Sequence, residues 1–147
     1  MLRTTALALS LTLAAAMAAQ AATQITKADF GVFAKGLIGQ PKFTPTRVVD
    51  SSKDKGYGWA IWLNTDKPKV HFHEVITLPS AVKVWPSDAF TKVNPTHTGA
   101  VTDKDVTPKD GMVSNLWSVS PDDPKGKYQI RVSVDGQPEK VFDFEVK

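Results

Sequence analysis

The feature that most constrains this chain is a strict alternation of apolar and polar side chains near its C-terminus. In residues 127–134 the apolar members are Tyr128, Ile130, Val132 and Val134, and polar or charged residues stand between them. Successive side chains of a strand point to opposite faces, so this period is typical of a strand with one buried face. The segment is therefore predicted to be a β-strand.

A second alternating run follows the first after a short turn. The turn is D-G-Q-P at 135–138, and Phe142, Phe144 and Val146 then alternate with charged residues. Two such runs across a short Gly-containing turn predict a β-hairpin.

Six earlier runs have the same character, and none of them sustains a helical period over three turns. We expect strands at 25–35, 47–50, 57–63, 70–78, 97–107 and 112–119, and loops in the turn-rich segments 36–46 and 79–96. The ten prolines fall mainly between the runs. Seven to eight short strands with one apolar face each predict an all-β fold, an immunoglobulin-like antiparallel β-sandwich.

The N-terminus has the features of a secretory signal peptide. Arg3 precedes an apolar run, and Ala19 and Ala21 form an A-x-A cleavage site. The run is short for a membrane span, and no second apolar stretch follows it. We expect residues 1–21 to be removed, leaving 22–147 as a single domain without a transmembrane segment. The expected location is periplasmic or secreted.

Composition excludes several kinds of chemistry. The chain has no cysteine, which rules out disulfides, thiolate metal sites and cysteine nucleophiles. Its 18 basic and 15 acidic residues are interspersed, so it lacks the one-signed basic stripe that favours nucleic acid. It also lacks the motifs of serine hydrolases, zinc proteases and phosphate-binding loops. We expect no nucleic-acid partner and no cofactor.

Three stretches resemble known bacterial proteins. The segment S-P-D-D-P-K-G-K-Y-Q-I-R-V-S-V-D-G-Q-P, before a closing F-D-F-E-V, resembles the last strand pair of immunoglobulin-like domains of bacterial envelope proteins. With the early A-D-F-G-V-F and the central V-I-T-L-P, it is similar to a small uncharacterised bacterial family of secreted immunoglobulin-like β-sandwich proteins, a domain of unknown function. The resemblance implies the fold and the compartment, and it supplies no catalytic residue.

Two of the three histidines, His71 and His73, stand one residue apart in K-V-H-F-H-E-V. On a regular strand they share the polar face, close enough to bind one metal ion. A stable site needs three or four ligands, and sequence ties no carboxylate to this face. Two half-exposed imidazoles are the favoured interpretation, and a metal site is the alternative.

Glu74 falls on the core face of the same run. A buried unpaired carboxylate is costly, and burial raises its pKa. A strand bulge that returns Glu74 to solvent, or a pair with a basic residue such as Arg47, is the favoured interpretation. The alternative interpretation is that Glu74 is a catalytic acid.

Aromatic residues provide the remaining functional indication. Trp59 and Trp62 are three residues apart and therefore lie on opposite faces of a regular strand, so only one of them faces the core. Trp85 and Phe90 lie in a turn-rich loop, where they either cap the open end of the sandwich or bind a partner.

The sequence favours a non-enzymatic binding or accessory module of the cell envelope, with Trp85 and Phe90 as candidate binding residues and an envelope protein as candidate partner. The alternative is a metal-binding or metal-handling periplasmic protein that uses His71 and His73. A small hydrolase that uses Glu74 is a third hypothesis.

Overall fold

The structure, a computed structural model, describes residues 22–35, 41–85 and 88–147, and within these ranges it consists of strands and loops. The predicted signal peptide, residues 1–21, lies outside the described residues. No helix in the described part of the chain has the length and apolar character that crossing a membrane requires. The strands are β1 (Gln24–Lys35), β2 (Pro41–Pro45), β3 (Val48–Val49), β4 (Gly56–Asn64), β5 (Val70–Thr77), β6 (Thr91–Val93), β7 (Gly99–Val106), β8 (Met112–Ser118), β9 (Gly126–Val134) and β10 (Lys140–Val146).

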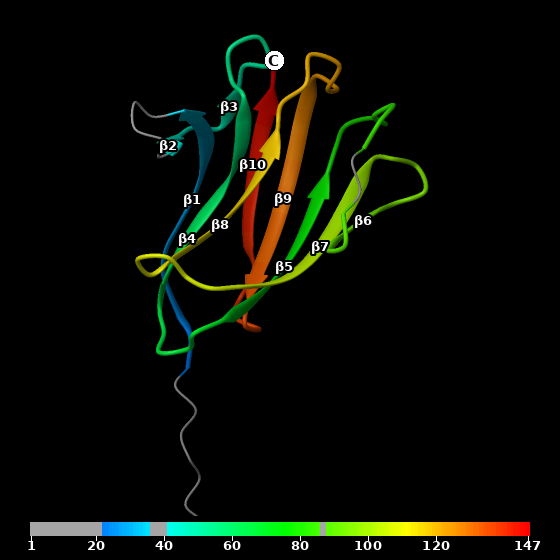
Figure 1. Cartoon of the computed structure of the whole chain (residues 1–147). Helices are drawn as coiled ribbons and strands as arrows, with labels where there is room; N and C mark the ends of the chain where they lie inside the picture. Colours follow the sequence, from blue (N-terminus) through cyan, green and yellow to red (C-terminus); the bar gives the residue numbers. More distant parts are fainter. Residues whose placement is uncertain (1–21, 36–40, 86–87) are drawn as a thin grey trace, which may run out of the picture.

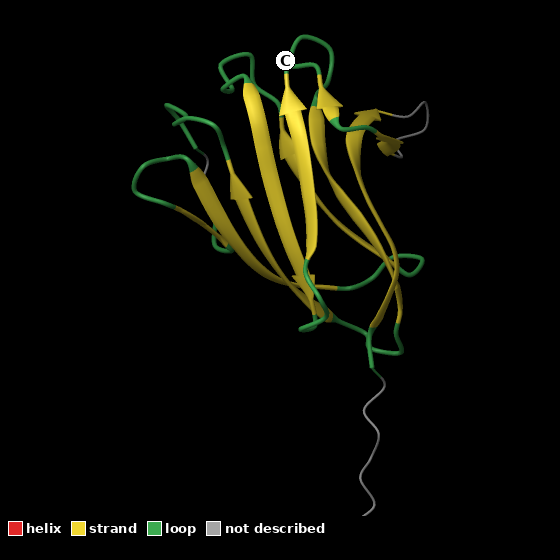
Figure 2. Cartoon of the chain, turned by 180° about the vertical axis from the view of Figure 1, so that it is seen from behind, coloured by secondary structure: helices red, strands yellow, loops and turns green. Residues whose placement is uncertain are grey.

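The strands form two sheets that face each other (Figure 1). One sheet has the order β2-β1-β4-β8, and the other has the order β3-β10-β9-β5-β7-β6. Neighbouring strands are antiparallel, apart from the short parallel pair of β3 and β10. The view from behind shows the same two layers, with loops gathered at both ends (Figure 2). The predicted all-β sandwich is confirmed, and each of the eight predicted runs contains a strand.

The segments 36–46 and 79–96, predicted to be loops, each contain a short strand. Strand β2 pairs with β1 and places Phe43 opposite Phe33, with ring centroids 4.9 Å apart. Its two prolines fit an edge strand, because such a strand pairs with a neighbour on one side only. Strand β6 has three residues, too few for a two-residue period to be recognised. The expectation of loops was wrong at these two places.

An aromatic cluster fills the core between the sheets. Phe30 of β1 stacks on Phe144 of β10 with ring centroids 4.2 Å apart. Tyr57 and Tyr128 also pack against Phe144. The Tyr128 hydroxyl donates a 2.9 Å hydrogen bond to the carbonyl of Pro124, four residues upstream. This bond resembles the tyrosine corner of immunoglobulin-type sandwiches.

The two tryptophans of β4 divide between the faces of the strand. Trp59 is fully buried in the core, and Trp62 lies on the opposite face, where the Lys27 ammonium stands 4.5 Å from its ring centroid. The prediction that only one of them faces the core is confirmed.

The two sheets differ in width, and on one side of the sandwich the larger sheet extends beyond the smaller one. Strand β8 is the last strand of its sheet, and its side chains contact β5 of the opposite sheet. Strands β7 and β6 continue beyond β5, so the inner face of the larger sheet extends past the smaller one (Figure 1). The loop between β5 and β6 belongs to this overhanging side.

Candidate functional site

A row of polar side chains crosses the inner face of the overhanging sheet. Strand register places Glu74 of β5 opposite Thr102 of β7, and Thr102 opposite Thr91 of β6. All three are buried, although the rest of the core is mainly apolar. The hydroxyls of Thr91 and Thr102 are 3.1 Å apart and form a hydrogen bond. The row marks the place where the apolar core gives way to a polar site.

Glu74 is the most unusual residue of this row, since it is 0 % exposed. Its carboxylate accepts hydrogen bonds from the indole N–H of Trp59, from the indole N–H of Trp117 at 2.6 Å, and from the side-chain amide of Asn115 at 3.0 Å. Strand β5 pairs with β7 and β9 without a register shift at this position. The favoured interpretations, a bulge or a pair with a basic residue such as Arg47, were therefore wrong.

The electrostatics of Glu74 follow from its surroundings. Burial raises the pKa of this carboxyl, and the hydrogen bonds from Trp59, Asn115 and Trp117 act in the opposite direction. All three donors are uncharged, so they satisfy the oxygen atoms and leave any negative charge without a neighbouring cation. Because those oxygens are enclosed, a substrate has no direct approach to them, and the geometry does not favour Glu74 as a catalytic acid.

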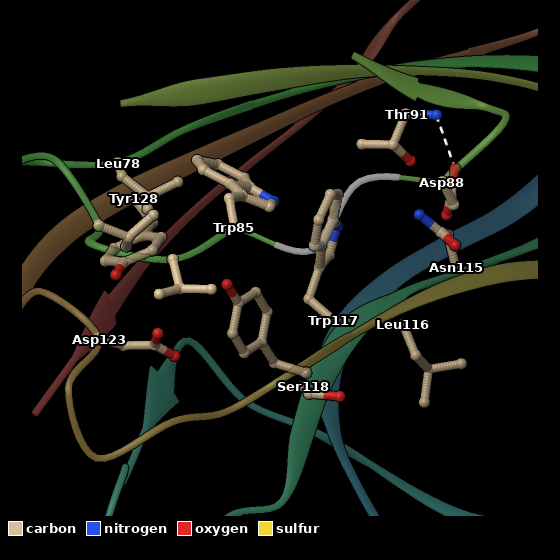
Figure 3. Close-up of a pocket in the computed structure, with 13 residues that line it drawn as sticks. Leu78, Trp85, Asp88, Thr91, Asn115, Leu116, Trp117, Ser118, Asp123 and Tyr128 are labelled. Carbon is tan, nitrogen blue, oxygen red and sulfur yellow. Dashed lines mark hydrogen bonds between the residues drawn. The ribbon is translucent and has the colours of Figure 1, made fainter. Parts of the chain in front are cut away.

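A pocket of about 330 Å³ adjoins this network, and its lining includes residues of β8 and of the loop that follows β5 (Figure 3). Asn115 and Trp117, which bind Glu74, also form part of its wall, so the buried carboxylate fixes two wall residues. The lining residues are Tyr57, Leu78, Val82, Val84, Trp85, Asp88, Thr91, Asn115, Leu116, Trp117, Ser118, Asp123 and Tyr128.

The pocket contains one of the two predicted binding residues. Trp85 lines it and meets Trp117 edge to face, with ring centroids 5.9 Å apart and ring planes 81° apart. Phe90 does not line the pocket; its side chain is exposed and lies 5.2 Å from the Lys104 ammonium. Phe90 and Thr91 donate backbone hydrogen bonds to the Asp88 carboxylate, which anchors this part of the loop beside the pocket.

Sequence reasoning missed Trp117, Asn115 and Asp123 as residues of the site. Trp117 lies in an alternating run that was read only as a strand, and no local signal indicated that its indole reaches a carboxylate 43 residues away. Asp123 belongs to the turn before β9. Only the pairing of distant strands brings these residues together.

The predicted metal residues lie on the opposite, outer face of β5. His71 Nδ1 is 2.8 Å from Asp105, and His73 Nδ1 is 2.8 Å from Asp103; both carboxylates come from the adjacent strand β7. Asp105 and Asp103 raise the pKa of His71, with the hydrogen bond to Asp105 as the largest cause. Among the described residues, no group of three or more histidine, aspartate or glutamate side chains is arranged to hold a metal ion. Metal binding by His71 and His73 stays a hypothesis.

Comparison with known proteins agrees with this architecture. The family model described as "PM0630 beta sandwich domain" matches residues 28–147. The chain belongs to this family. No curated protein matches the sequence. The PM0630 beta sandwich match begins within β1 and includes the whole pocket.

Two solved structures are similar to this PM0630 beta sandwich domain. An immunoglobulin-like protein from Pseudomonas aeruginosa is 17 % identical, with a TM-score of 0.53, and the match covers 88 % of this chain and 99 % of that one. It supports the immunoglobulin-like fold alone. An alkylpurine DNA glycosylase of Pseudomonas fluorescens, bound to DNA, is 13 % identical over 82 % of this chain and 30 % of its own. Its TM-score of 0.39 is too low to support an argument.

Proposed function

We propose that this domain is a non-catalytic binding module of the cell envelope, and that it holds its ligand in the pocket beside Trp85 and Trp117. The observation that carries the proposal is the Glu74 network that adjoins the pocket. Burying a carboxylate among neutral donors lowers the stability of the fold. Here the buried carboxylate holds two pocket-lining side chains, Asn115 and Trp117, in place through hydrogen bonds. Binding sites need a rigid first layer of side chains held by a second layer, and this arrangement supplies both.

The surface around the pocket supports the same proposal. Val84 is 82 % exposed, Leu116 is 45 % exposed, and both line the pocket. Exposed Phe90 follows on the same loop as Val84. Exposed apolar side chains gathered at a concave site are typical of recognition surfaces. A mixture of apolar walls and a few fixed polar groups is the usual composition of a small-ligand site.

Export to the envelope is the second part of the proposal. It rests on the predicted signal peptide, with cleavage after Ala21. The periplasmic or secreted location fits a module that meets its ligand or an envelope partner outside the cytoplasm.

The binding function can be tested by a ligand screen on residues 22–147, watched by NMR. The four tryptophans give four indole N–H signals, of which those of Trp85 and Trp117 report on the pocket and that of Trp62 reports on a distant face. The library should contain neutral, anionic and cationic small molecules. We expect some members to shift the Trp85 and Trp117 signals while the Trp62 signal stays in place. A screen in which no compound moves the two pocket signals more than that of Trp62 would refute the proposal.

A further inference from the structure

We infer that the ligand group taken by the pocket is an organic cation of the alkylammonium class. This inference rests on the proposed function, since it names the chemistry of the ligand that the same pocket would hold. It is carried by two features that occur together: aromatic walls and charged lining groups of one sign.

Four aromatic residues are among those that line the pocket. Trp85 and Trp117 meet edge to face at the pocket, with their ring planes 81° apart. Tyr57 and Tyr128, which are buried and also line the pocket, form a second edge-to-face pair at 78°. The face of an aromatic ring carries partial negative charge and attracts ammonium groups, most strongly when the ring is that of tryptophan.

The charged lining groups are all acidic. Asp88 and Asp123 line the pocket, at opposite sides of the two indoles in Figure 3, and no lysine, arginine or histidine is among its lining residues. Glu74 lies behind the wall and is bound to Asn115 and Trp117. A cleft with charges of one sign and low-dielectric walls concentrates the field within it, which here favours a cation.

Two basic residues of this region, Lys83 and Lys104, lie outside the pocket lining. Lys104 lies over the ring of Phe90, outside the lining, and acts on Asp88. Asp123 has a different partner, because its carboxylate accepts a 2.8 Å hydrogen bond from the backbone of Ser120. Asp123 also helps to raise the pKa of Tyr57, after burial and Tyr128, and Glu74 contributes in the same direction. The charge of Asp123 therefore reaches the Tyr57 ring, which is part of the pocket lining.

The volume of the pocket suits a small ligand. About 330 Å³ is at the lower end of the range of small-molecule sites and admits a trimethylammonium group with a short substituent. Choline represents a free alkylammonium compound, and N-acetyl-lysine methylamide represents a lysine side chain presented by a protein. The neutral compound 3,3-dimethyl-1-butanol has the shape of choline without its charge.

The test compares the binding of these three compounds to residues 22–147 by calorimetry and by the indole signals of Trp85 and Trp117. We expect the better of the two cations to bind about tenfold or more tightly than the neutral alcohol. Tighter binding of choline than of the lysine compound assigns a free ligand, and the reverse order assigns a partner's side chain. Equal binding of cation and neutral alcohol would overturn the inference, as would the absence of binding by both cations.

Variants identify the charge that is responsible. Asp123→Asn keeps an oxygen that can accept the Ser120 hydrogen bond, so the loop is preserved while the charge is lost. We expect it to weaken cation binding about threefold or more and to leave binding of the neutral alcohol unchanged. Asp122→Asn is the matched control, because Asp122 is exposed and does not line the pocket. Equal effects of the two substitutions would contradict the inference.

The two proposals fail in different ways. If other members of the library shift the pocket signals while cations bind no better than their neutral analogues, the binding function stands and the cation inference falls. If no compound of any charge reaches the pocket, the proposed function itself falls.

Discussion

At the scale of single residues, Glu74 shows most clearly what the fold has placed at the site. A buried carboxylate that receives three neutral N–H donors satisfies its hydrogen-bonding capacity but not its charge. Removing any one of these hydrogen-bond partners lowers the stability of the fold, since it leaves a buried polar atom unsatisfied. Glu74 therefore couples the stability of the core to the shape of the pocket.

This coupling predicts a pH dependence of stability. Burial raises the pKa of Glu74 above its ordinary value of 4.5, so above that pH the folded state retains a proton that the unfolded state has lost. The stabilisation from this group is complete below pH 4.5 and is lost as the pH rises through the raised pKa. Glu74→Gln cannot titrate, so the free energy of unfolding of the wild type relative to this variant should fall as the pH rises from 4.5 toward neutrality.

Urea unfolding at a series of pH values measures the effect of Glu74→Gln. Glu139→Gln is a suitable control, because that side chain is exposed. Parallel profiles for the wild type and Glu74→Gln would show that Glu74 is not the buried titrating group described here.

At the scale of strands, much of the structure was predictable from local pattern. The alternation in 127–134 and around Phe142 and Phe144 identified β9 and β10, and parity separated Trp59 from Trp62. The short strands β2 and β6 were not predictable, because their pairing with β1 and β7 stabilises them and their own sequences carry no clear period. Local sequence determines which face of a strand is apolar, whereas its neighbours determine what that face meets.

The terminal hairpin offers a direct test of the assigned faces. Tyr128→Ala or Phe144→Ala should lower the free energy of unfolding by about 3–5 kcal/mol, because each substitution leaves a cavity in the aromatic cluster between the sheets. Val141→Ala on β10 is the control, since Val141 is an exposed side chain. Denaturant unfolding gives the three values. A loss for the aromatic variants no larger than that for Val141→Ala would mean that these rings do not form the core.

The outer face of β5 carries a different prediction. His71→Ala combined with His73→Ala should change the free energy of unfolding by about 1 kcal/mol or less, because exposed ion pairs with Asp103 and Asp105 contribute little. Thermal unfolding with and without micromolar zinc or copper measures both stability and metal binding. Stabilisation of the wild type by either metal, abolished in the double variant, would favour the metal-binding alternative.

At the scale of the whole molecule, the pocket arises from the unequal width of the two sheets. Strand β8 ends its sheet above β5, while β7 and β6 extend the opposite sheet, and the loop carrying Trp85 lies over this edge. The sequence indicated the Trp85 loop as a candidate binding region, and Trp85 lines this pocket. It could not supply Trp117, Asn115 or Asp123, because their proximity depends on strand order and register rather than on spacing along the chain.

Export is the prediction that belongs to the entire chain. Intact-mass measurement of the protein recovered from the envelope fraction should show a polypeptide that begins at Ala22, since Ala19 and Ala21 fit the small-residue positions of a signal peptidase site. A membrane-embedded product that retains residues 1–21 would contradict the proposed location.

The central claim, that the pocket is the binding site, is tested most directly by the affinity of Trp85→Ala for the tightest ligand found in the screen. Trp85 forms one wall of the pocket and is only partly buried, so the variant should keep its fold and lose about tenfold or more in affinity. Phe90→Ala, outside the lining, should have a smaller effect. Unchanged affinity in a folded Trp85→Ala variant would place the binding site elsewhere and contradict the account.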